Sequence, residues 1–74
     1  MIIVKSNLIV YEGITPKIHE NVFLAKGTYI IGDVTIASHS NIWFNTVIRG
    51  DVHPITIGTY TNIQDNSTIH AMHD

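Results

Sequence analysis

The feature that most constrains the fold of this 74-residue chain is a six-residue repeat of branched aliphatic side chains. From Ile18 to Ile48 every sixth residue is isoleucine or leucine. After a slip of three residues, the repeat resumes at Ile57 and runs to Ile69. This period differs from the 3.6 residues of an amphipathic helix and from the plain alternation of an isolated strand. It is typical of a parallel β-helix, in which six-residue units wind into stacked triangular coils.

A second restricted position lies four residues after each aliphatic residue. It holds small or β-branched side chains and is interrupted only at His73; the other members are Val22, Thr28, Val34, Ser40, Thr46, Val52, Thr61 and Ser67. Alternate residues of a strand point to the same side, so these side chains share the interior with the aliphatic residues. We therefore expect an aliphatic stack along the axis and small residues at the narrow corners.

The repeat divides the chain into two regions. Residues 1–17 are predicted to be lead-in strands, at 2–4 and 8–11, that cover the first coil. Residues 18–74 are predicted to form a hexapeptide-repeat β-helix with coils at 18–35, 36–52 and 57–74. The extra loop between the last two coils is predicted at 53–56, because Pro54 cannot donate to a central ladder. The expected fold is all-β, with no interior helix.

Composition excludes several classes of function. The net charge of −2 and the lack of a basic run argue against nucleic-acid binding. No apolar stretch approaches the roughly 20 residues that span a bilayer, and the chain starts unlike a signal peptide. We therefore expect a cytoplasmic protein with no membrane partner. Without cysteine, disulfides and thiolate metal sites are also excluded.

Three coils are about the minimum for a stable solenoid, and the last coil would present open strand edges. We therefore expect this chain to be a fragment, or to be stabilised by a partner.

The repeat also predicts which side chains face outward, one position after each aliphatic residue. On two neighbouring faces these outward columns are Ile31, Arg49 and His70, and Ala25, Trp43 and Gln64. An outward arginine beside a large aromatic residue suggests an interface, because apolar patches rimmed by polar groups mark contact sites. The alternative to an interface is that the arginine is solvated and the tryptophan is partly covered by its own chain. The other histidines, His19, His39 and His53, are predicted to be surface groups.

Several motifs within residues 11–70 occur together. They are Ile42-Trp43-Phe44, Val47-Ile48-Arg49-Gly50-Asp51, Asn62-Ile63-Gln64-Asp65 and Ile69-His70. In this combination the chain resembles the N-terminal part of the gamma-class carbonic anhydrase-like family. The resemblance implies a left-handed parallel β-helix of about three coils, lacking the family's later coils and C-terminal helix.

The resemblance also implies a site. His70 matches the first of three metal-ligating histidines in the family, where the metal is zinc, or iron or cobalt in some members. Gln64 matches the catalytic residue that positions the metal-bound water. Arg49, Asp51 and Asp65 match ion pairs across the interface of a homotrimer, with ligands coming from two chains.

The function implied by the resemblance is a lyase activity, the reversible hydration of carbon dioxide to bicarbonate. Two of the three family ligands have no counterpart in this chain, so we expect it to be inactive by itself. One alternative is a non-catalytic binding or scaffold protein, like family members assigned to siderophore binding or complex assembly. A second alternative is a hexapeptide acyltransferase.

Overall fold

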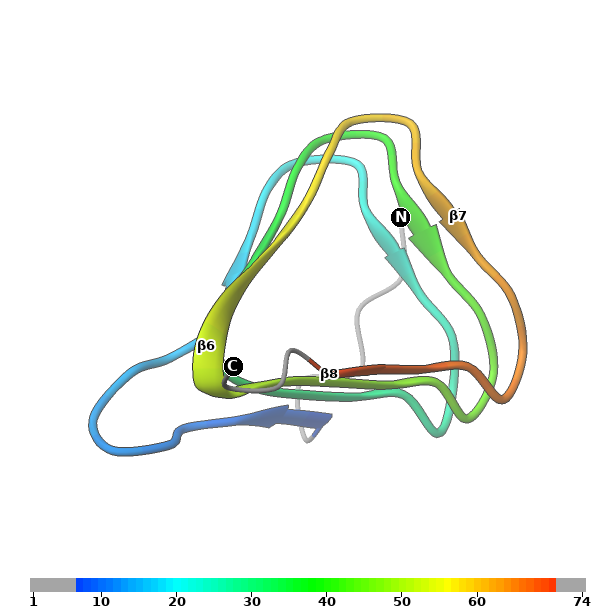
Figure 1. Cartoon of the computed structure of the whole chain (residues 1–74). Helices are drawn as coiled ribbons and strands as arrows, with labels where there is room; N and C mark the ends of the chain where they lie inside the picture. Colours follow the sequence, from blue (N-terminus) through cyan, green and yellow to red (C-terminus); the bar gives the residue numbers. More distant parts are fainter. Residues whose placement is uncertain (1–6, 71–74) are drawn as a thin grey trace.

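A computed structural model describes residues 7–70 and shows a parallel β-helix of about three coils with a triangular cross-section (Figure 1). The chain circles clockwise in Figure 1 as it advances toward the viewer, which makes the winding left-handed. No helix occurs in this part of the chain, and so none that could cross a membrane. The fold predicted from the six-residue repeat is confirmed.

Within the described residues eight strands form two parallel sheets. They are β1 (Leu8–Ile9), β2 (Lys17–Ile18), β3 (Phe23–Leu24), β4 (Tyr29–Ile36), β5 (Asn41–Ile42), β6 (Val47–Ile57), β7 (Asn62–Ile63) and β8 (Thr68–His70). One sheet has the order β1-β4-β6-β8, with β2 also paired to β4, and the other has the order β3-β5-β7. The long strands β4 and β6 each bend around a corner of the triangle, as Figure 1 shows for β6.

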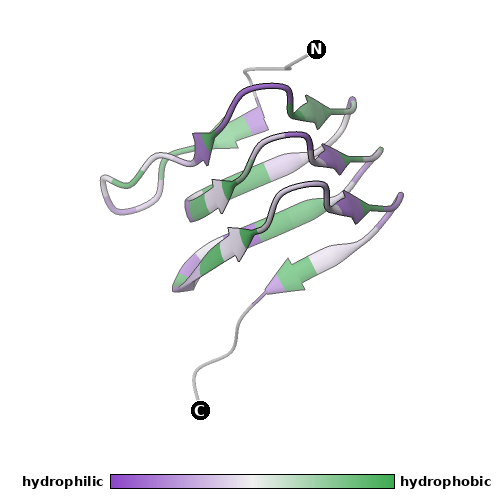
Figure 2. Ribbon diagram, turned by 90° about the horizontal axis from the view of Figure 1, so that it is seen from above, coloured by the Kyte–Doolittle hydropathy of each residue, from purple (hydrophilic) through white to green (hydrophobic). Residues whose placement is uncertain are grey.

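The core is the aliphatic stack that the repeat predicts. Leu24 and Ile42 are neighbours on one face, Ile30 and Ile48 are neighbours on another, and all four are fully buried. Figure 2 shows the hydrophobic segments lying over one another from coil to coil. Small polar residues fill the corners, where Thr28, Ser40 and Thr46 are also buried.

The extra loop lies earlier than the sequence predicts. Gly50 pairs with Gly32 and Ile55 pairs with Val34, so the four residues 51–54 lie opposite Asp33 alone. The three extra residues are therefore among 51–54 rather than at 53–56. Ile55 therefore takes the interior position that was assigned to Val52, whose exposed fraction is 51%. Ile57 pairs with the buried Ile36 and therefore faces the interior. Alternate residues of a strand face the same side, so Ile55, two residues earlier, also faces inward.

The lead-in reaches the first coil through β1. Leu8 pairs with Ile30 and Ile9 with Ile31, so β1 extends the sheet by one strand beyond β4. A tight turn follows, in which the backbone groups of Tyr11 and Ile14 bond to each other at 3.0 Å. The strand predicted at 2–4 and the repeat position occupied by His73 lie outside the described residues.

The corners repeat a left-handed backbone conformation. Successive coils place Asn21, His39 and Tyr60 at one corner, with φ between 56° and 65°. Asparagine adopts this conformation more easily than other residues that carry a Cβ, because its side chain bonds locally. The rings of His39 and Tyr60 stack there with centroids 4.8 Å apart.

Candidate functional site

The candidate site begins with the outward column on the β4-β6-β8 sheet. Pairing sets Ile31 beside Arg49 and Arg49 beside His70. The predicted order of this column is therefore confirmed. The arginine side chain is 41% exposed, whereas the imidazole of His70 is 21% exposed.

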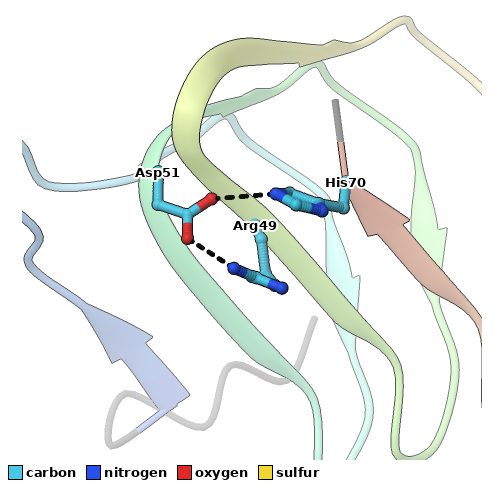
Figure 3. A network of polar contacts seen from close by, with 3 residues as sticks. All are labelled: Arg49, Asp51 and His70. Carbon is cyan, nitrogen blue, oxygen red and sulfur yellow. Dashed lines mark hydrogen bonds and ion pairs between the residues drawn. The ribbon is translucent and has the colours of Figure 1, made fainter. Parts of the chain in front are cut away.

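Asp51 joins this column from the bend of β6. The Nη2 group of Arg49 donates to Asp51 Oδ2 at 2.7 Å, and Asp51 Oδ1 lies 3.4 Å from His70 Nε2 (Figure 3). Gly50 lets the bend pack closely, because a Cβ at this position would lie 2.4 Å from the carbonyl oxygen of Asp33. The carboxylate thus bridges a guanidinium and an imidazole that belong to different coils.

The electrostatics of this group centre on Asp51. The hydrogen bond from Arg49 holds the pKa of the Asp51 carboxyl below its usual value, and partial burial opposes that effect. Asp51 Oδ1 and His70 Nε2 are both enclosed, and neither has a hydrogen-bond partner within residues 7–70. They face each other at contact distance without the alignment of a hydrogen bond.

The structure separates the other two predicted site residues from this group. Gln64 and Asp65 follow β7 in the second sheet, and both are exposed. Within residues 7–70 the polar contacts at the site are the Arg49–Asp51 ion pair and the approach of Asp51 to His70, and Asp65 takes part in neither. The roles of Gln64 and Asp65 remain predictions.

The described residues do not by themselves fit the metal that the resemblance implies. No group of three or more His, Cys, Asp or Glu side chains in this part of the chain could hold an ion. A catalytic zinc ion is bound by three protein ligands, as in carbonic anhydrase. His70 is the imidazole that matches a family ligand, so we assign no catalytic step to the described residues of one chain.

A cluster of aromatic rings lies on the β3-β5-β7 face. The ring centroids of Phe23 and Trp43 are 4.9 Å apart, and those of Trp43 and Phe44 are 6.2 Å apart. The indole Nε1 of Trp43 donates to Asn41 Oδ1 at 3.0 Å. Trp43 is therefore half-buried, as the alternative of a partly covered tryptophan predicts.

Two other predictions concern the exposure of single side chains, and the structure confirms them only in part. Ala25, expected in an outward column, is buried. Of the three histidines expected at the surface, His19 and His39 are exposed and His53 is half-buried. The aromatic contact of Phe23 with Trp43 was not predicted from the sequence. The signal for it is that Phe23 directly precedes Leu24 of the repeat and is therefore in register with Asn41, next to Trp43 on the neighbouring coil.

Comparison with known proteins shows what this chain is similar to. Residues 15–50 match the bacterial transferase hexapeptide family model. The chain is 55% identical over 60 residues to a carbonic anhydrase of Geobacillus kaustophilus, covering 81% of this chain and 33% of that protein. It is 57% identical over 54 residues to a probable carbonic anhydrase of Methanocaldococcus jannaschii, covering 73% of this chain and 34% of that protein.

A solved structure agrees with the fold. The crystal structure of a hexapeptide transferase family protein from Anaplasma phagocytophilum superposes with a TM-score of 0.85 at 43% identity, covering 88% of this chain and 39% of that one. The chain spans about a third of the length of the two carbonic anhydrases it matches. The resemblance drawn from the sequence motifs is confirmed for the matched residues.

Proposed function

We propose that this chain, a hexapeptide-repeat relative of gamma carbonic anhydrases, contributes His70 to a metal site for the reversible hydration of carbon dioxide. The observation that supports this is the contact of His70 with Asp51, whose other oxygen accepts from Arg49. Histidines that bind metals are commonly oriented by a neighbouring carboxylate. The imidazole is half-buried beside this carboxylate, so it loses less freedom on binding than an exposed side chain would.

The metal proposed is zinc, or iron or cobalt, and His70 is the ligand that the described residues would supply. By resemblance, a homotrimer brings such ligands together at the interface between copies. The face that carries Arg49 suits an interface, because it also presents Tyr29 with an exposed fraction of 45%. The proposed roles of Gln64, next to the metal-bound water, and of Asp65, as an interface partner of Arg49, follow from the resemblance. A cytoplasmic location remains a prediction from the sequence.

Because the described residues do not hold an ion by themselves, metal binding is tested in a fusion of this chain with the segment of the Geobacillus kaustophilus carbonic anhydrase that follows the match. The fusion is dialysed against Zn²⁺ or Co²⁺, its metal content is measured, and the cobalt absorption spectrum reports imidazole ligation. We expect binding that His70→Ala abolishes and that His19→Ala, an exposed histidine of the first coil, leaves unchanged. Absence of binding, or equal binding by His70→Ala, would refute the proposal.

Activity is a separate measurement. Hydration of carbon dioxide is followed by stopped flow with a pH indicator, with and without the metal. Metal-dependent turnover that His70→Ala removes supports the enzymatic function. A chain that binds metal without turnover would instead fit the non-catalytic binding or scaffold protein.

An acyltransferase is a further candidate, favoured by the similarity to the hexapeptide transferase family structure. Enzymes of this kind need a cleft for the acyl donor, and no pocket is found within the described residues. Saturable binding of acetyl-coenzyme A to the chain in calorimetry would support this candidate.

A further inference from the structure

A column of one cation, one aromatic ring and one anion lies at a corner of the triangle. Lys26, Phe44 and Asp65 each come two residues after the end of β3, β5 or β7. These strands pair in register, so the three residues occupy equivalent positions of successive coils. Figure 1 shows the turns after these strands lying over one another at one corner. We call Lys26, Phe44 and Asp65 the corner ridge.

Hydrogen bonds between the turns keep the corner ridge in register. The backbone amide of Asn45 donates to the carbonyl of Lys26 at 3.4 Å, and the amide of Asn66 donates to the carbonyl of Phe44 at 2.9 Å. Neighbouring strands of a sheet lie about 4.8 Å apart. Lys26 and Asp65 are therefore each one such step from Phe44, on opposite sides of it. The ridge has equal spacing between its cation, its ring and its anion.

All three side chains of the corner ridge are open to solvent. Lys26 and Asp65 are exposed, and Phe44 has an exposed fraction of 44%. Within residues 7–70 neither charge joins an ion pair. Beside Phe44, the ring of Trp43 is held by its hydrogen bond to Asn41, which gives the exposed ring a fixed neighbour. An aromatic residue between charged groups is typical of an interface, in which a central ring is surrounded by a polar rim.

The order of the corner ridge makes it complementary to itself. A two-fold axis through Phe44, perpendicular to the axis of the β-helix, reverses the column in a second copy. Lys26 of each copy then faces Asp65 of the other, and the two Phe44 rings meet at the axis. Both ion pairs form together, because each charge lies one coil from Phe44. Isologous contacts of this kind use the same patch on both subunits.

We propose that two copies of this chain associate through the corner ridge, side by side and antiparallel, about this two-fold axis. The charges select the antiparallel order, because a parallel order places like charges opposite each other. The dimer is weak and depends on concentration, since a corner offers less contact area than the roughly 800 Å² per partner of a stable interface. Salt weakens it further by screening exposed charges.

This contact goes beyond the proposed function. It needs no metal, and it uses the corner after β3, β5 and β7 instead of the face that carries Arg49. The two proposals give Asp65 different partners, which are Arg49 in a homotrimer and Lys26 in the two-fold dimer. Substitution of Lys26 therefore distinguishes them, because it leaves the Arg49 and Asp65 side chains unchanged.

The test measures the mass of the full chain by sedimentation equilibrium over a range of concentrations at low ionic strength. We expect a monomer–dimer equilibrium whose dissociation constant rises about tenfold or more in Lys26→Asp, because like charges then face each other. Phe44→Ala should raise it by a similar factor, since it removes the aromatic anchor. The matched control Lys17→Asp changes the net charge equally at an exposed residue of β2, and should leave the constant almost unchanged.

A mixture of two charge variants gives the sharpest result. Lys26→Asp has a carboxylate at both ends of the corner ridge, and Asp65→Lys has an ammonium group at both ends. Neither variant should dimerise alone, whereas an equimolar mixture should form a heterodimer about as tight as the natural dimer. Circular dichroism checks that each variant is folded.

Three results would overturn the proposal. These are a natural chain that stays monomeric at all concentrations, a mixture of the folded variants that does not associate, or an assembly of three copies that Lys26→Asp leaves intact. Metal binding by the fusion is measured independently, so the failure of one proposal is distinguishable from the failure of the other.

Discussion

Gly50 gives the sharpest test of how the corner beside the candidate site is built. A Cβ on Gly50 would lie 2.4 Å from the carbonyl oxygen of Asp33, whereas ordinary contacts begin at 3.4 Å. The obstructing atoms are backbone, so the two coils must separate to admit a methyl group. Overpacking of this kind costs about 1–3 kcal/mol, and the loss of freedom in the unfolded chain returns only about 0.4–1 kcal/mol.

We therefore expect Gly50→Ala to lower the free energy of unfolding by about 2 kcal/mol, since backbone gives way less easily than a side chain. In a domain of this size that corresponds to a fall in Tm of roughly 8–16 °C. The assay is thermal and urea unfolding followed by circular dichroism in the β-sheet region.

Gly58→Ala is the matched control. A Cβ at Gly58 would meet nothing closer than the Thr61 hydroxyl at 3.9 Å. The loss of unfolded-state freedom should then dominate and stabilise the chain by about 0.4–1 kcal/mol. Equal stability of Gly50→Ala and the natural chain would refute the account of the corner.

Three further predictions concern other parts of the coil. Ile55→Ala should cost at least about 1 kcal/mol, and Val52→Ala less than about 0.5 kcal/mol, because Ile55 packs against the core and Val52 is exposed; urea unfolding that ranks them the other way would contradict the observed loop position. Asn66→Ala should cost about 1 kcal/mol and Asn66→Gly almost nothing, since Asn66 has a φ of 61°; the comparison of the two melting curves decides this. The lowered pKa of Asp51 contributes stability above the unfolded carboxyl value of about 3.9, and this contribution is lost as the pH falls through the lower folded value. Asp51→Asn should therefore flatten the loss of stability below pH 4 in urea titrations, and an unchanged acid profile would contradict the Arg49–Asp51 bond.

The contrast between Val52 and Ile55 shows where the sequence was insufficient. Counting forward from Ile48 places Val52 inside, and counting backward from Ile57 places Ile55 inside. Both residues are β-branched and apolar, so composition does not choose between them. The pairing of β6 with β4 decides between them, because its hydrogen bonds set Ile55, and not Val52, beside Val34 of the preceding coil.

Asp51 shows a similar limit at the candidate site. The repeat places Arg49 and His70 in one column, and the structure confirms their register. The repeat does not predict the position of Asp51, because the segment that contains the extra residues begins directly after Gly50. Only the folded corner brings its carboxylate between the guanidinium and the imidazole.

The sequence by itself determined the architecture of this protein, because aliphatic residues spaced six apart are buried together when six-residue units stack into coils. It also determined the outward order of Ile31, Arg49 and His70, which follows from strand parity and register. The tertiary structure decided the position of the inserted loop, the contact between Asp51 and His70, and the distance of Gln64 and Asp65 from them. These depend on how corners bend and on which coils touch, and such long-range contacts leave no periodic signal in the chain.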